Sequence, residues 1–306
     1  MRHDIALHLT FYRLDDTSQL TFLTKLVDRV SKPASQDAFV YAKVAVAGIK
    51  LRQADENGAR ADLDAASAIL DTFDSVETVV HASFYRVSAD YYQSKQEFAS
   101  YYKSALLYLA CVNVAELTTE DRRARAHDLC VAALVSDSIY NFGELLLHPI
   151  LDSLQDTPQA WLRELLFAFN RGNLRAYDVL SGHISQDPLL KDREGFLHQK
   201  ISLAALTESV FRRPPHDRAM TFTTIRNETN VPSDEIEHLV MKALSLGLVR
   251  GTIDQVAQVA DINWVQPKVL DMVQIEGMRE RLREWDASVN KLGTWMEGVG
   301  KDVWAT

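Results

Sequence analysis

The chain has 306 residues, enough for about two domains at ~150 residues each. Hydrophobic residues make up 47% and charged residues 25%, a composition that supplies a packed core and excludes a disordered chain. With 12 Gly and 8 Pro, the two residues are used at roughly half their usual rate, which favours a mainly helical protein over turn-rich β-sandwiches and barrels. The net charge of −9 excludes a general affinity for nucleic acid or anionic membranes.

Targeting and membrane signals are absent from the sequence pattern. Acidic residues beginning with Asp4 interrupt the first 16 residues, which lack the apolar core of a signal peptide. The most apolar stretch, residues 39–51, is broken by two lysines and falls short of the ~20 residues that span a membrane. Cys111 and Cys130 are too few for a disulfide framework. We therefore predict a reducing, intracellular compartment and no membrane partner.

Short helices separated by weak breakers fill residues 4–210. The predicted helices span residues 37–53, 61–72, 77–96, 97–115 and 122–136. A further apolar helix face containing Trp161 and Phe169 stops at Gly172, which suits a C-terminal cap, and Asn173 suits the N-cap of the next helix. Helix pairs with no strand pattern predict a right-handed stack of helical hairpins, similar to tetratricopeptide repeats but without a strict period.

Eight aromatic residues fall within the 25 residues from Phe84 to Tyr108. Aromatic side chains can stack nucleic-acid bases, but the charge of this segment is only +1. We therefore predict that these side chains are wedged between helices of the stack.

The pattern changes near residue 211, where Pro214 and Pro215 must break a helix. A short strand at 220–222 and a helix at 223–230 come next. Ser233 is predicted to cap a second helix, and Gly247 to end it in a left-handed conformation. Two strands at 248–253 and 258–264 complete a winged helix over residues 211–266. Alternation in the second strand predicts Ala260, Ile262 and Trp264 on one side.

Winged helices often bind DNA, but the charge of this one disfavours it. Residues 216–266 contain four Lys or Arg and seven Asp or Glu, a net of −3. The second helix begins with Asp234, Glu235 and Glu237, so repulsion would replace the attraction to phosphate. We predict that this unit docks on protein. A winged-helix regulator that binds DNA is the alternative from a different class.

Catalytic and metal-binding patterns are missing. The nine histidines form neither HxH nor HExxH, and His127 with Cys130 on one helix face is predicted to be core packing. Residues 298–301 resemble a phosphate loop, but Asp302 stands where Ser or Thr would bind magnesium. We predict no enzyme activity, no catalytic or metal-ligating residues and no cofactor.

The sharpest periodic signal lies after Pro267. Apolar residues recur at spacings of three and four, as in a heptad pattern of a helix that packs along a narrow seam. The seam consists of Ile275, Met278, Leu282, Trp285, Val289, Leu292, Met296, Val299 and Val303. We expect this helix to pair with helices of other subunits; the alternative is that it folds back on its own winged helix.

The order of helical repeats, winged helix and C-terminal helix resembles the PCI proteins, which occur in the proteasome lid, the signalosome and a translation initiation factor. Four segments show a closer resemblance to one family within this class. They are residues 141–149 (NFGELLLHP), 169–173 (FNRGN), 241–249 (MKALSLGLV) and 264–267 (WVQP). Together they resemble the family of the 26S proteasome non-ATPase regulatory subunit 13.

This resemblance implies a non-catalytic scaffold subunit of the regulatory-particle lid, located in cytoplasm and nucleus and acting in ubiquitin-dependent protein degradation. It implies that the winged helix docks on other PCI subunits, that the C-terminal helix joins a bundle of lid helices, and that the ubiquitin-receptor subunit lies nearby. For the winged-helix interface we predict Asp234, Glu235, Ile262 and Trp264, and for the C-terminal interface the seam from Ile275 to Met296. A PCI subunit of a signalosome or an initiation complex is the alternative within the same class.

We divide the chain into three parts. N-terminal helical repeats occupy residues 1–99, a PCI domain residues 100–266 and a C-terminal bundle helix residues 267–306. Within the PCI domain, the helical part covers 100–210 and the winged helix 211–266. Because the resembling family has additional N-terminal helices, we expect this chain to begin inside the helical array.

Overall fold

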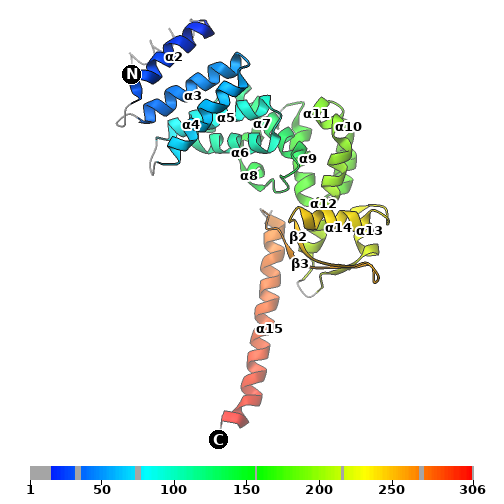
Figure 1. Cartoon of the computed structure of the whole chain (residues 1–306). Helices are drawn as coiled ribbons and strands as arrows, with labels where there is room; N and C mark the ends of the chain where they lie inside the picture. Colours follow the sequence, from blue (N-terminus) through cyan, green and yellow to red (C-terminus); the bar gives the residue numbers. More distant parts are fainter. Residues whose placement is uncertain are drawn as a thin grey trace.

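The computed structural model describes residues 15–31, 36–72, 77–155, 157–214, 217–268 and 272–304. Figure 1 shows three parts in chain order: an array of helices, a small unit with a three-stranded sheet, and one long helix that projects away from both. No helix among the described residues is long and apolar enough to cross a membrane.

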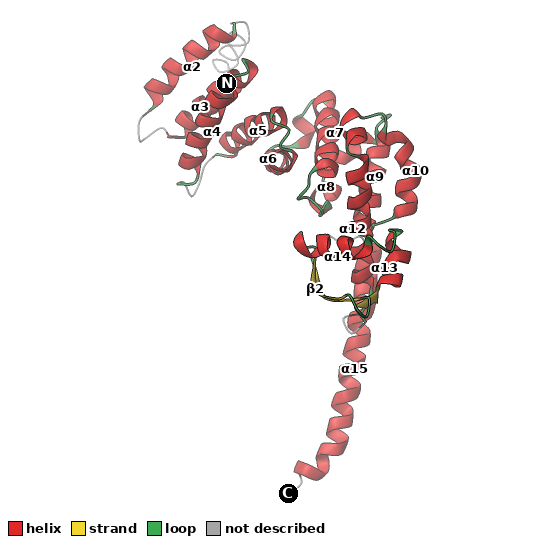
Figure 2. Ribbon diagram, turned by 45° about the vertical axis from the view of Figure 1, so that its right-hand side comes forward, coloured by secondary structure: helices red, strands yellow, loops and turns green. Residues whose placement is uncertain are grey.

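Helices stacked side by side form the N-terminal array, as the two views in Figures 1 and 2 agree. The prediction of a helical solenoid is confirmed. One helix begins earlier than predicted, because the side chain of Asp55 accepts a hydrogen bond of 3.0 Å from the Gly58 amide and caps the helix at Glu56. The elements are α2 (Asp16–Val30), α3 (Gln36–Arg52), α4 (Glu56–Leu70), α5 (Thr78–Ser94), α6 (Phe98–Cys111), η2 (Val114–Glu116), α7 (Thr119–Val135), α8 (Gly143–Leu147), η3 (Pro149–Leu154), α9 (Ala160–Arg171), α10 (Leu174–Ile184), α11 (Pro188–Asp192) and α12 (Glu194–Arg212).

The turn between α9 and α10 has the predicted caps. Gly172 ends α9 with a left-handed φ of 60°, and the Asn173 side chain accepts a hydrogen bond from the Ala176 amide at 3.2 Å. A side chain at Gly172 would place its Cβ 2.6 Å from the Cα of Ala205 on α12. Glycine is therefore required here both by conformation and by the close approach of α12.

The aromatic residues of α5 and α6 belong to the core. Tyr91, Tyr101, Tyr102 and Tyr108 are all buried, and the last three join one large cluster with α7 and α9. Cys130 lies fully buried in the same cluster. Core packing is thus confirmed for these residues, which present no aromatic surface on which bases could stack.

The second unit has the element order of a winged helix and packs on α12. It comprises β1 (Ala219–Thr221), α13 (Phe222–Thr229), α14 (Ile236–Ser245), β2 (Val249–Asp254) and β3 (Val259–Val265). The sheet is antiparallel with strand order β1-β3-β2. Its core continues into Leu203, Leu206 and Val210 of α12, so the array and the winged helix share a helix.

Of two predicted helix ends in the winged helix, one was wrong and one is confirmed. Ser233 lies in a turn and does not cap α14, which begins at Ile236; its hydroxyl accepts a hydrogen bond of 3.4 Å from Arg226. Gly247 does end the helix region with the predicted left-handed φ of 69°.

Strand β3 contains an irregularity that the alternation did not reveal. Arg250 faces Trp264 across the sheet, but the next residue, Gly251, faces Ile262, so one residue of β3 is extra. The face of the strand changes at this bulge. Trp264 is therefore separated from Ile262 and packs on the exposed Arg250, whose guanidinium lies 4.5 Å from the ring centroid.

The third part is α15 (Met272–Trp304), a single helix of 33 residues. It begins beside α12 and the sheet and extends away from the rest of the molecule in both views.

Candidate interaction surfaces

The described residues contain no group of three His, Cys, Asp or Glu side chains that could hold a metal ion. His127 instead contacts two carboxylates: its Nδ1 lies 3.2 Å from Asp128, and its Nε2 lies 3.3 Å from Asp187. The hydrogen bond to Asp128 and the charges of both carboxylates raise the pKa of His127. Asp187 also caps α11, so this contact joins α11 to α7. Local spacing could not reveal Asp187, which is far along the chain.

The predicted winged-helix interface residues divide into two groups. Asp234 and Glu235 are exposed in the turn before α14, and Trp264 is half-buried beside Arg250. Ile262 is only 1% exposed and lies in the winged-helix core. Because its side chain is enclosed by its own domain, Ile262 is a core residue and its assignment to a partner surface is corrected.

One edge of the sheet is open in the described part of the chain. β2 is the last strand in the order and pairs with β3 alone among the described strands. Its exposed side chains are Arg250, Thr252 and Asp254. An unpaired edge strand can accept an additional strand from another molecule.

The seam of α15 is exposed along the part of the helix whose side chains are described. The exposed fractions range from 43% for Met278 to 66% for Trp285. The exposed seam residues are Ile275, Met278, Leu282, Trp285, Val289, Leu292 and Met296, while the side chains of Val299 and Val303 lie outside the described set. The alternative in which α15 folds back on the winged helix is therefore not what the structure shows.

Trp295 adds a large apolar side chain that the heptad analysis missed, because it lies beside the seam at the position before Met296. Its side chain is 62% exposed. Contiguous exposed apolar patches of this size are uncommon on protein surfaces and often coincide with interaction sites.

Three family models match consecutive parts of the chain. One described as PSD13 N-terminal repeats matches residues 3–166, the PCI domain matches residues 174–264, and one described as the Rpn9 C-terminal helix matches residues 268–300. The probable 26S proteasome regulatory subunit rpn9 of Schizosaccharomyces pombe is 43% identical over 96% of this chain and 77% of its own length. The chain belongs to the Rpn9 family of 26S proteasome regulatory subunits.

Other members of the Rpn9 family are similar to this chain over most of its length. Homolog A of the 26S proteasome non-ATPase regulatory subunit 13 from Arabidopsis thaliana is 37% identical over 92% of this chain and 74% of its own length. The regulatory subunit RPN9 of Saccharomyces cerevisiae is 41% identical over 80% of this chain and 63% of its own length. The resemblance found in the sequence is thereby confirmed.

A more distant relative is a subunit of a translation initiation factor. Subunit M of eukaryotic translation initiation factor 3 from Aspergillus clavatus is 25% identical over 67% of this chain and 44% of its own length. This likeness is much weaker than that to the Rpn9 proteins, so the initiation-factor alternative is disfavoured.

Proposed function

We propose that this chain is a structural subunit of the lid of the 26S proteasome regulatory particle, and that α15 is its main means of attachment. The observation that carries the proposal is the exposed seam from Ile275 to Met296 on a helix that projects from the body. A heptad seam of this kind packs against the seams of other helices. The family resemblance favours a bundle of lid helices as the partner.

The winged helix supplies a second contact in this proposal. Strand β2 offers backbone groups along its open edge, and Asp234 with Glu235 offers negative charge beside α14. A neighbouring PCI subunit with a strand edge and basic side chains would complement both. The ubiquitin-receptor subunit is a further candidate neighbour, supported by the family resemblance alone.

The proposed role is non-catalytic and belongs to the cytoplasm and nucleus. This role is supported by relatives that are non-ATPase regulatory subunits of the 26S proteasome. The protein would therefore support ubiquitin-dependent degradation by holding other subunits in place.

Purification from cells tests the proposal. A tagged chain should elute with lid subunits, and Asp234→Lys with Glu235→Lys should reduce their recovery roughly tenfold through slower association. Exchanging Glu116 and Glu120, two exposed carboxylates of the array, for Lys is the matched control and should leave recovery unchanged. Elution with initiation-factor subunits, or tight binding to duplex DNA at physiological salt, would overturn the assignment.

A further inference from the structure

A largely buried ion pair holds the chain that precedes α15 against the body. Lys268, just before α15, pairs through Nζ with the carboxylate of Glu208 on α12. The same Nζ donates a hydrogen bond of 3.1 Å to the backbone oxygen of Asn170 at the end of α9. The Glu208 side chain is only 5% exposed and that of Lys268 16%. A charge pair shielded to this degree is screened little by salt.

A second tie lies further along the helix. The guanidinium of Arg281 donates a hydrogen bond of 3.2 Å to the backbone oxygen of Phe211 and lies 5.3 Å from the centroid of its ring. Arg281 is about 13 Å along the axis from the first residue of α15. Glu208 and Phe211 are one turn apart at the end of α12, so a single rigid element holds both ties.

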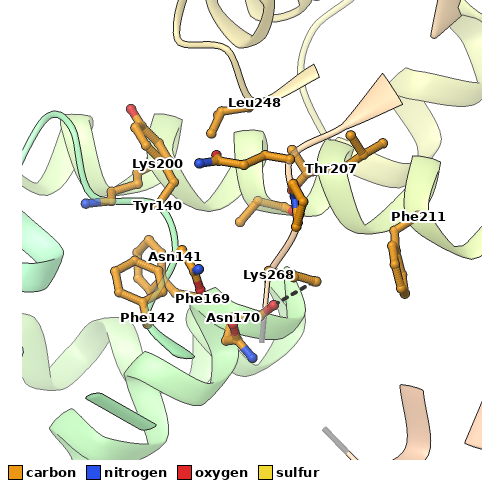
Figure 3. A pocket seen from close by; sticks show the side chains of 14 residues that line it. Tyr140, Asn141, Phe142, Phe169, Asn170, Lys200, Thr207, Phe211, Leu248 and Lys268 are labelled. Atoms are coloured by element: carbon orange, nitrogen blue, oxygen red, sulfur yellow. Dashed lines mark hydrogen bonds between the residues drawn. The ribbon is translucent and has the colours of Figure 1, made fainter. Parts of the chain in front are cut away.

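Residues 265–268, which precede α15, run through the junction between the array and the winged helix. Figure 3 shows Lys268 directed at Asn170 there, with Phe142 and Phe169 nearby. The junction encloses a cavity of about 30 Å³ that Leu248, Val265 and Pro267 also line. All four segments that carry the family resemblance contribute to this lining. Those segments therefore meet where α15 leaves the body.

Two contacts at different points fix the direction of α15 relative to the body, whereas the helix could rotate about a single contact. A helix of 33 residues is about 50 Å long, so a rotation of roughly 10° at its base would move its far end by roughly 9 Å. Interdigitation of seam side chains tolerates much less than that displacement.

We propose that Lys268, acting through Glu208, is a positioning residue that fixes the direction in which α15 leaves the body. Arg281 is the second positioning residue of the same device. Neither residue belongs to the seam. Both keep the seam in the position in which partner helices would pack against it. The consequence for assembly rests on the proposed function, but the direction of the helix can be measured without it.

Distance measurements between spin labels on the full chain test the proposal. One label is placed at Val179→Cys on α10 and the other at Lys291→Cys on α15, both exposed, with Cys111→Ser and the fully buried Cys130 retained. Lys268→Met should at least double the width of the distance distribution. Glu208 keeps Arg212 at 3.0 Å in this variant, so no buried carboxylate is left without a cation.

The matched control alters a different ion pair of Glu208. Arg212→Gln removes a second cation that contacts Glu208 and should leave the distribution as narrow as in the parent chain. Lys268→Arg retains the charge and should stay close to the parent width. Arg281→Met is an independent second variant that should widen the distribution as Lys268→Met does.

Three results would overturn the positioning role. The first is an unchanged distribution in both Lys268→Met and Arg281→Met, and the second is equal widening in Arg212→Gln. The third is equal widening between labels at Val179→Cys and the exposed Leu107→Cys on α6, which would show that the whole body has loosened.

Incorporation of the same variants into the proteasome lid separates this proposal from the proposed function. A wider distribution with roughly tenfold slower incorporation supports both. A wider distribution with unchanged incorporation leaves the positioning role standing and contradicts attachment through α15.

Discussion

Lys200 on α12 donates a hydrogen bond of 2.7 Å to the backbone oxygen of Ser136, just beyond the end of α7. Its Nζ also donates to the carbonyls of Ala133 at 2.8 Å and Leu134 at 3.0 Å. The last carbonyls of a helix have no partner within the helix, so this buried lysine caps α7 from another helix. Burial lowers the pKa of Lys200 to about 7, which shows the cost of placing a charge there.

Replacing Lys200 should destabilise the array. Lys200→Met leaves three buried carbonyls without a donor, and each such loss costs about 1–3 kcal/mol. Relief of the buried charge offsets part of this loss, so we expect the free energy of unfolding to fall by about 3 kcal/mol. Urea denaturation measures this decrease in the free energy of unfolding. Lys191→Met, on the exposed surface of α11, is the control and should change stability by less than about 0.5 kcal/mol. Equal midpoints for the two variants would contradict the capping role.

The contact of His127 with Asp128 and Asp187 should make stability depend on pH. Because the folded state raises the pKa of His127, the protonated ring stabilises the fold. This contribution is fully present below the unfolded-state pKa of about 6.5 and is lost as the pH rises through the higher folded-state value. The stability advantage of the parent chain over His127→Gln should therefore shrink from about pH 6 to about pH 8. Parallel stability curves for the two proteins over this range would show that the contact is without effect.

The bulge in β3 predicts intolerance of a side chain at Gly251. A Cβ there would lie 2.1 Å from the backbone oxygen of Asp261 and 2.9 Å from the Cα of Ile262. Neither backbone atom can move without disturbing the strand pair, so Gly251→Ala should cost about 2 kcal/mol. Thermal unfolding checks this value, with Thr252→Ala on the exposed side of the same strand costing less than about 1 kcal/mol. A Gly251→Ala chain as stable as the parent would be evidence against this strand register.

Local patterns predicted most of the elements because caps and apolar periodicity act over a few residues. Gly172, Asn173 and Gly247 mark their turns through backbone conformation and side-chain hydrogen bonds, both of which depend on near neighbours. The bulge in β3 opposite Gly251 could not be predicted from local patterns, because it depends on the pairing of two strands. The start of α14 was misplaced because Ser233 bonds to Arg226 and not to the helix.

The interaction surfaces were only partly predictable for the same reason. The α15 seam follows from spacing within one helix, and its exposure was then found in the structure. The assignment of Ile262 to a partner surface failed because alternation shows two faces of a strand but not which face its own domain covers. The tie between Lys268 and Glu208 joins residues far apart in the sequence, and no local pattern indicates it.

The exposed seam gives the most direct test of attachment through α15. Leu282 and Trp285 are 57% and 66% exposed in the chain alone, so Leu282→Ala with Trp285→Ala should leave its melting temperature unchanged. Covering the exposed part of both side chains would contribute about 2–4 kcal/mol to binding, so incorporation into the lid should weaken by roughly 30- to 900-fold. Most of this loss should be faster dissociation. Glu280→Ala with Arg283→Ala, on the polar side of the same helix, is the matched control and should assemble normally. A melting temperature several degrees lower together with normal incorporation would mean that the seam packs within its own chain.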